Sequence, residues 1–173
     1  AKLNAWLNGT TPDGYPVTSL LGAPIVGALR IKQSDLLSVV IDSETKEKFH
    51  HIIGCIPQVL HPAEEHSTFS EVNEGINEKD LYDLSNYCFR QGILEDRFGL
   101  PLIARALEQS QICLKPQGKV TFIIGGRPGP REIQAMFERR AFIPELVLSR
   151  RIPQADDTDL DSLVELERAH DIK

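Results

Sequence analysis

The sequence predicts an α/β fold around a parallel-rich sheet, because two apolar runs resemble buried strands and helical patterns separate them. Phe49–Ile53 and Val120–Ile124 are apolar runs that each end in glycine. Such runs are typical of strands that are covered on both faces of a parallel sheet. We therefore expect the two runs to be adjacent, central and buried strands.

A glycine-rich turn after the second run indicates a ligand site. Gly125–Pro130 interrupts the chain directly after Ile124, and apolar residues then return at the spacing of a helix face, at Ile133, Met136 and Phe137. In open α/β sheets, ligands bind at the carboxyl ends of strands, where the N–H groups of a following helix are also available. This turn is the first candidate for a binding site.

Between the two strands the chain is predicted to be helical. Glu78–Gln91 and Leu94–Gln111 carry apolar residues at helical spacing. Pro101 is compatible with a helix if it occupies the first turn of a new helix that begins after Gly99. Lys115–Gly118 has the composition of a turn that leads into the second strand.

The C-terminal part is predicted to form an antiparallel hairpin at one edge of the sheet. Phe142–Ile152 and Leu160–Leu166 are the two strand candidates, and the short acidic connection at 154–159 suits a hairpin loop. Upstream, the polar stretch 61–77 is expected to be an exposed loop. A chain of 173 residues fits one domain, 1–173.

The composition favours a small-molecule or protein partner. The formal charge is −6 and no basic stripe is present, which argues against binding to nucleic acid or to an anionic membrane. No apolar run approaches the roughly 20 residues of a membrane span. The three cysteines lack C-x-x-C spacing, so a reducing, cytoplasmic location is expected. The histidines and Cys55 match no standard zinc spacing, so we expect no metal site.

Two polar residues near strand ends each have two interpretations. The amide of Gln58 offers donors and an acceptor to a ligand if Cys55–Gln58 forms a pocket wall, but this segment is equally compatible with an ordinary loop after a strand. Asp35 either caps the helix that follows it or accepts a hydrogen bond from a ligand. The sequence leaves both questions open.

Several motifs resemble those of one enzyme family. They are SDLL at 34–37, IIGCIPQVL at 52–60, LSNYC at 84–88, QGILEDRFGLPLIARALE at 91–108, GGRPG at 125–129 and RRAF at 139–142. The combination of GGRPG with IGCIPQ is specific. On these motifs the chain resembles the class I S-adenosylmethionine-dependent methyltransferases, and within them the methionine S-methyltransferases of plants.

The resemblance implies a Rossmann-like methyltransferase fold and a set of site residues. GCIPQ stands where related amino-group methyltransferases have an Asn-Pro-Pro-Tyr motif that handles a nitrogen acceptor. A thioether sulfur has no proton to lose, so no catalytic base is required, and catalysis would consist of positioning the sulfur and excluding water. The substrate-binding residues implied by the resemblance are Cys55, Ile56, Pro57 and Gln58, and the implied cofactor-binding residues are Asp35, Leu36 and Gly54. Gly125, Gly126 and Arg127 of the glycine turn join the substrate site because both segments leave carboxyl ends of strands. Arg127 either anchors a substrate carboxylate or is a surface arginine that pairs with Glu95, Asp96 or Glu132.

The same resemblance implies that the fold is incomplete at its N-terminus. The glycine-rich loop and the acidic residue that hold S-adenosylmethionine in class I enzymes are not found, and Ala1–Asn8 resembles the helix that follows them. The implied partners are L-methionine and a missing N-terminal cofactor half or another chain, and self-association is left open. Two alternatives are a methyltransferase-like interaction module without cofactor and an amine or protein methyltransferase.

Overall fold

The structure is a computed structural model, and it divides the chain into two compact units, residues 1–39 and 40–173. We describe each unit by itself, so the single-domain prediction stays a prediction. The residues that the structure describes are 10, 11, 13, 15–22, 24, 30–43, 48–60, 78–151, 153, 164 and 168.

The first unit contains little regular structure among its described residues. Two isolated antiparallel bridges join Thr10 to Pro16 and Thr18 to Pro24. The short helix α2 (Ser38–Ile41) begins near the end of this first unit.

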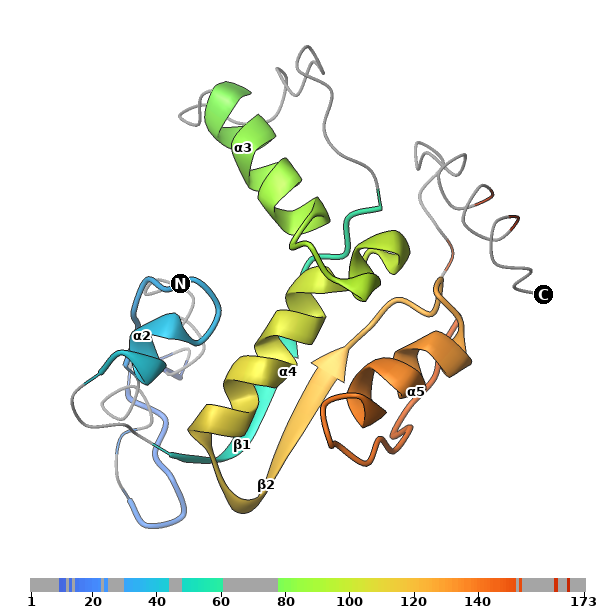
Figure 1. Ribbon diagram of the computed structural model, residues 1–173. Coiled ribbons are helices and arrows are strands. Elements are labelled where there is room, and N and C mark those ends of the chain that lie inside the picture. The colour runs from blue at the N-terminus through green and yellow to red at the C-terminus, as the bar shows by residue number, and fades with distance from the viewer. Residues whose placement is uncertain are drawn as a thin grey trace. The chain divides into compact units, whose positions relative to one another are not determined.

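In the second unit, β1 (Phe49–Cys55) and β2 (Leu114–Ile123) form a two-stranded parallel sheet. Ile52 pairs with Val120, and Ile53 pairs with Thr121. The prediction that these two runs are adjacent strands is confirmed. A parallel pair needs a long crossover between its strands. This crossover contains α3 (Glu78–Phe89), the 3-10 helix η2 (Leu94–Phe98) and α4 (Pro101–Cys113), as Figure 1 shows.

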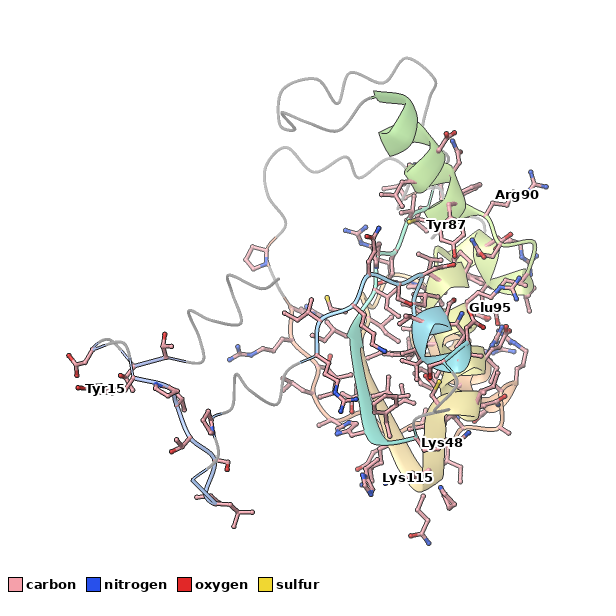
Figure 2. The ribbon with its side chains drawn as sticks, turned by 90° about the vertical axis from the view of Figure 1, so that its left-hand side faces the viewer. Tyr15, Lys48, Tyr87, Arg90, Glu95 and Lys115 are labelled. Carbon is pink, nitrogen blue, oxygen red and sulfur yellow. The ribbon has the colours of Figure 1, made fainter. Side chains whose placement is uncertain are left out.

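The two strands also begin at the same end of the sheet. Lys48 and Lys115 lie together there (Figure 2), and Lys115 Nζ is 3.4 Å from His50 Nε2. The opposite end of the sheet is therefore where both strands present their carboxyl ends, which is the edge that binds ligands in α/β proteins.

As predicted, η2 ends at Gly99 and a new helix, α4, begins at Pro101. Gly99 ends η2 in the left-handed conformation with φ 65°, and its N–H donates to the carbonyls of Asp96 and Glu95. Pro101 then occupies the first turn of α4, as predicted.

Residues 115–118 are part of β2 and do not form the separate turn that was predicted. Phe49 pairs with Leu114 but His51 pairs with Lys119, so β2 contains several more residues than β1 over this interval. Gln117 has a positive φ of 62° within this irregularity. The turn composition therefore produces a bulge inside the strand.

One face of the sheet packs against α4 and α5 (Pro130–Glu138), which lie beside the strands in Figure 1. Ile103 and Leu107 of α4 and Met136 of α5 are fully buried, and Val120 and Phe122 of β2 pack against them. The rings of Phe122 and Phe137 lie 6.5 Å apart, as in a tilted aromatic pair.

The other face of this sheet is exposed, so the predicted cover on both faces is wrong for the part of the chain that the structure describes. Ile53 is 72% exposed and Ile123 is 67% exposed. Along the last residues of β2, exposed and partly buried residues alternate as in a half-buried strand, although the run Val120–Ile124 is mostly apolar.

The predicted C-terminal hairpin is not observed in the described residues. Residues 142–151 form no strand, and Val164, which belongs to the second predicted strand, is helical. Ile143 and Val147 are largely exposed, and Pro144 has no N–H group to give to a ladder. The predicted N-terminal helix at 1–8 and loop at 61–77 lie outside the described residues.

A buried ion cluster joins η2, α4 and the residues after α5. The Glu95 side chain is 2% exposed and accepts hydrogen bonds of 2.8 Å from both Arg139 Nη2 and Arg140 Nη1. Arg140 Nη2 also lies 2.9 Å from Glu108 Oε1. Burial raises the pKa of Glu95, but the hydrogen bonds from Arg140 and Arg139 outweigh burial, so the pKa lies below the usual glutamate value. The cluster fixes the C-terminal end of α5 against α4 and η2.

Replacing Glu95 by Gln is expected to lower the free energy of unfolding by about 3 kcal/mol near neutral pH, because two guanidinium groups lose their buried carboxylate partner. The folded-state pKa of Glu95 is lowered, so its stabilising contribution is present above the unfolded pKa and is lost as pH falls through the folded pKa. Urea unfolding from about pH 7 down to about pH 3 should show the difference between the two proteins shrinking. Glu138→Gln, at an exposed glutamate on α5, is the control. Equal stability of Glu95→Gln and the parent at neutral pH would contradict the role of the cluster.

Gly99 and Gly92 form a matched pair for testing the turn before α4. Both have positive φ, 65° and 74°, but a Cβ on Gly99 would lie 2.8 Å from Leu60 Cδ2, whereas a Cβ on Gly92 would meet nothing within 4 Å. We expect Gly92→Ala to cost about 1 kcal/mol of unfolding free energy, from backbone strain alone, and Gly99→Ala about 2–4 kcal/mol. Thermal and urea unfolding measure both changes. Equal costs would show that the contact with Leu60 carries no energy.

Candidate functional site

The carboxyl ends of β1 and β2 bring two predicted site segments to the same edge of the sheet. Cys55 pairs with Ile123 as the last registered pair of the ladder. From this pair the chain continues into residues 56–60 on one side and into the glycine turn 124–129 on the other. The parallel register therefore places two loops side by side that are separated by about 67 residues in sequence.

An open pocket of about 440 Å³ lies between these loops, within the size range of small-molecule sites. Its apolar lining consists of Leu60, Phe98, Ile123 and Ile124, and its polar lining consists of Gln58, Gly125, Gly126, Arg127 and Arg150. Among the residues that the structure describes, the lining contains two arginines and no acidic side chain. Such a pocket suits a ligand with both an apolar part and an anionic group.

Gln58 contacts both backbone polar groups of Gly125, its N–H and its carbonyl, through the two ends of the side-chain amide. The Gly125 N–H donates to Gln58 Oε1, and Gln58 Nε2 donates to the Gly125 carbonyl at 3.4 Å. The side chain therefore links the loop after β1 to the turn after β2.

Arg127 lies in a turn that leads directly into α5. The Gly129 N–H donates to the Gly126 carbonyl at 3.0 Å, which closes the turn, and Pro128 and Gly129 are buried. Arg127 itself is exposed and lines the pocket. A buried turn with an exposed arginine at its tip fixes the backbone while leaving the guanidinium at the pocket.

Other predicted substrate residues lie next to the pocket but do not line it. Cys55 and Pro57 are exposed, and Ile56 packs against the hydrophobic core. The structure thus brings Gln58, Gly125, Gly126 and Arg127 together and leaves these three residues outside the lining.

Packing accounts for one of the predicted cofactor residues. Gly54 pairs with Phe122, and a Cβ on Gly54 would lie 2.9 Å from the Phe122 ring. The absence of a side chain at this position therefore lets the aromatic ring lie against β1.

The other two predicted cofactor residues belong to the first unit. The Ser38 N–H donates to the Asp35 carbonyl at 3.0 Å, and the Val39 N–H donates to Ser34 Oγ at 2.9 Å. Leu36 has a positive φ of 50° in this turn. These bonds describe the start of α2, so the proposed cofactor role of Asp35 and Leu36 stays a prediction.

Sequence reasoning missed five residues that line the pocket: Ile123 and Ile124, which were predicted only as part of a strand, and Leu60, Phe98 and Arg150. Phe98 belongs to a helical apolar stripe, so its pattern predicted only a core position. Arg150 lies in a segment that was predicted as an edge strand, and Leu60 at the end of an apolar run. Only the folded chain brings these residues to Gln58, because no local pattern distinguishes them.

Two further observations concern metal ions and membranes. Among the described residues, no group of three or more His, Cys, Asp or Glu side chains is arranged to hold a metal ion. No helix in that part of the chain is both long enough and apolar enough to cross a membrane.

The chain is similar to known proteins over nearly all of its length. It is 42% identical over 97% of its residues to the methionine S-methyltransferase of Hordeum vulgare. The identity is 41% over 97% of the chain for the enzyme of Zea mays, and 40% over 96% for that of Wollastonia biflora. The chain spans about 15% of the length of each of these relatives.

No family model and no solved structure matches the chain. All four of these relatives are methionine S-methyltransferases, which is the family that the motifs GGRPG and IGCIPQ had indicated. The predicted resemblance is therefore confirmed, and the chain is a relative of one segment of the methionine S-methyltransferases.

Proposed function

We propose that this chain forms the methyl-acceptor side of a methionine S-methyltransferase, as one part of a longer enzyme. The identity of 40–42% over at least 96% of the chain carries this proposal. Because the chain spans about 15% of those relatives, the remaining parts of the active site would come from elsewhere in the longer enzyme or from another chain.

The pocket supports the acceptor role through its charge. A free amino acid brings a carboxylate, and the guanidinium groups of Arg127 and Arg150 lie in the pocket lining. The methionine side chain is apolar and would lie against Phe98, Ile123 and Leu60. Arg127 is our candidate for the carboxylate anchor, with a planar fork that matches carboxylate geometry.

The reaction makes modest chemical demands on these residues. S-adenosylmethionine, when bound, would supply the methyl group to a thioether sulfur. That sulfur carries no proton, so the chain needs no general base. Its own task would be to hold the methionine at its carboxylate and side chain and to exclude water from the sulfur.

The described pocket by itself does not fit the methyl donor. Its lining has no carboxylate to accept hydrogen bonds from ribose hydroxyls, and its arginines disfavour a sulfonium cation. The glycine at 54 is accounted for by Phe122. We keep Asp35, Leu36 and Gly54 as the proposed cofactor contacts of this chain and assign the remaining contacts to other parts of the longer enzyme or to another chain.

An interaction module is the second candidate, and the exposed sheet face favours it. Ile53 and Ile123 present apolar surface that a protein partner could cover. Calorimetric titration of the chain with S-adenosylmethionine and with methionine distinguishes the two. Methionine binding supports the acceptor role, and the absence of binding to either ligand supports the module.

A chimera tests the proposed function directly. We expect methyl transfer to methionine to be retained when this chain replaces the homologous segment of the Hordeum vulgare enzyme, because the two segments are 42% identical. Transfer of label from S-adenosylmethionine to methionine measures the activity. A chimera that folds and binds S-adenosylmethionine but transfers no methyl group would contradict the proposal.

Arg127→Lys tests the anchor in the same chimera. Lysine keeps the charge but loses the bidentate geometry, so we expect the KM for methionine to rise about 10- to 100-fold, as expected for roughly 1.5–3 kcal/mol of charge-assisted hydrogen bonding. Arg131→Lys, at an exposed arginine on α5 outside the pocket lining, is the matched control. An unchanged KM for Arg127→Lys would leave Arg127 with a structural role only.

A further inference from the structure

We propose that Gln58 is a positioning residue, whose amide holds the Gly125 peptide and thereby sets the place of the turn that carries Arg127. This inference rests on the proposed function, which it deepens by assigning how the substrate side of the pocket is kept in shape. It also changes the role of Gln58, from a residue that contacts methionine to a residue that acts through its neighbour.

The hydrogen bonds define the interaction. An amide presents two N–H donors and an oxygen with two lone pairs. One donor and the oxygen of Gln58 are engaged by the carbonyl and the N–H of Gly125. Few other side chains can satisfy the N–H and the carbonyl of one residue at once, because a carboxylate has no donor and an ammonium has no acceptor. The geometry therefore explains why an amide is present at position 58.

The missing side chain at position 125 is the second observation. A Cβ on Gly125 would lie 2.9 Å from Gln58 Oε1 and 3.7 Å from its Cδ. Gly125 is not among the residues with positive φ, so its backbone does not itself require glycine. Close approach of the Gln58 amide is thus the reason for a glycine here. The neighbouring Gly126 has nothing within 4 Å of its Cβ position and serves as the contrast.

The contact lies where it can affect the anchor. The ladder between the strands reaches Cys55 and Ile123, and Gln58 extends the connection beyond that pair to Gly125. Gly125 is two residues from Arg127, which lies inside the turn that the bond from the Gly129 N–H to the Gly126 carbonyl closes. A shift of the Gly125 peptide would therefore move the arginine relative to the apolar lining of the pocket.

The two residues can be perturbed from opposite sides. Gln58→Met keeps the length of the side chain and removes both hydrogen bonds. Gly125→Ala keeps Gln58 but pushes its flexible amide away from the peptide. If the contact is the functional unit, both variants lose the same interaction and the double variant is no worse than either single variant.

Steady-state kinetics of the active chimera compare the two single variants, Gln58→Met and Gly125→Ala, with the double variant. We expect each single variant to raise the KM for methionine about tenfold, with kcat and the KM for S-adenosylmethionine within about twofold of the parent. The double variant is expected to match the single variants. Gln134→Met, which removes an exposed amide that bonds Glu138 on α5, is the control and should leave the kinetics unchanged. An unchanged KM in Gln58→Met, or effects that add in the double variant, would overturn the proposal.

A second measurement separates this inference from the proposed function. In the isotope-labelled 173-residue chain, Gln58→Met should shift the Gly125 amide resonance and increase its hydrogen exchange, whereas Gly126→Ala should leave the Gln58 side-chain amide signals in place. Unchanged Gly125 signals would overturn the contact itself. A parent chimera without methyl transfer would instead overturn the proposed function, and with it the substrate role assigned to the contact.

Discussion

The parallel register of β1 with β2 is the constraint on which the candidate site depends. Cys55 and Ile123 are the last registered pair, so both strands end together and both following loops start from the same edge. A register shift of one residue would reverse the faces of all side chains in a strand. A shift of β1 would expose Ile52, and a shift of β2 would expose Phe122. Either shift would move Gln58 relative to Gly125 and disturb the pocket. The register of β1 with β2 therefore determines both the packing of the sheet and the position of the pocket.

The helical layer fixes that register from one side. Ile103, Leu107 and Met136 pack against the alternate residues of the strands that face α4 and α5, so only one register buries the apolar side chains. The ion pairs of the Glu95 cluster add specific hydrogen bonds to this apolar packing, and those bonds have a defined geometry. Because Arg140 contacts both Glu95 and Glu108, the end of α5 is tied to two helices at once.

Local patterns predicted the elements better than they predicted how those elements are covered. The glycine at 99 and the proline at 101 set the start of α4 through backbone chemistry that is readable from sequence, and the structure has the break there. The apolar run ending at Ile124 predicted a strand for a similarly local reason. Whether a strand is covered on one face or two depends on segments distant in sequence, so Ile53 and Ile123 were wrongly expected to be buried. The prediction of a C-terminal hairpin was wrong for residues 142–151. Their composition suggested a strand, but no partner strand is present among the described residues. In the pocket, the resemblance indicated Gln58 and the glycine turn indicated Arg127, whereas Phe98 and Arg150 could be found only from the fold.

The difference in burial between the two groups of arginines has a consequence for ionic strength. The side chain of Arg140 is only 10% exposed, so added salt screens its pairing with Glu95 weakly. Arg127 and Arg150 are exposed at an open pocket, where a Debye length of about 8–10 Å at moderate salt limits their reach toward an approaching anion. Raising salt should then slow the capture of a carboxylate ligand while leaving the fold around the pocket intact. The chain thus separates the charges that maintain its architecture from those that line the pocket, and ionic strength acts more strongly on the second group.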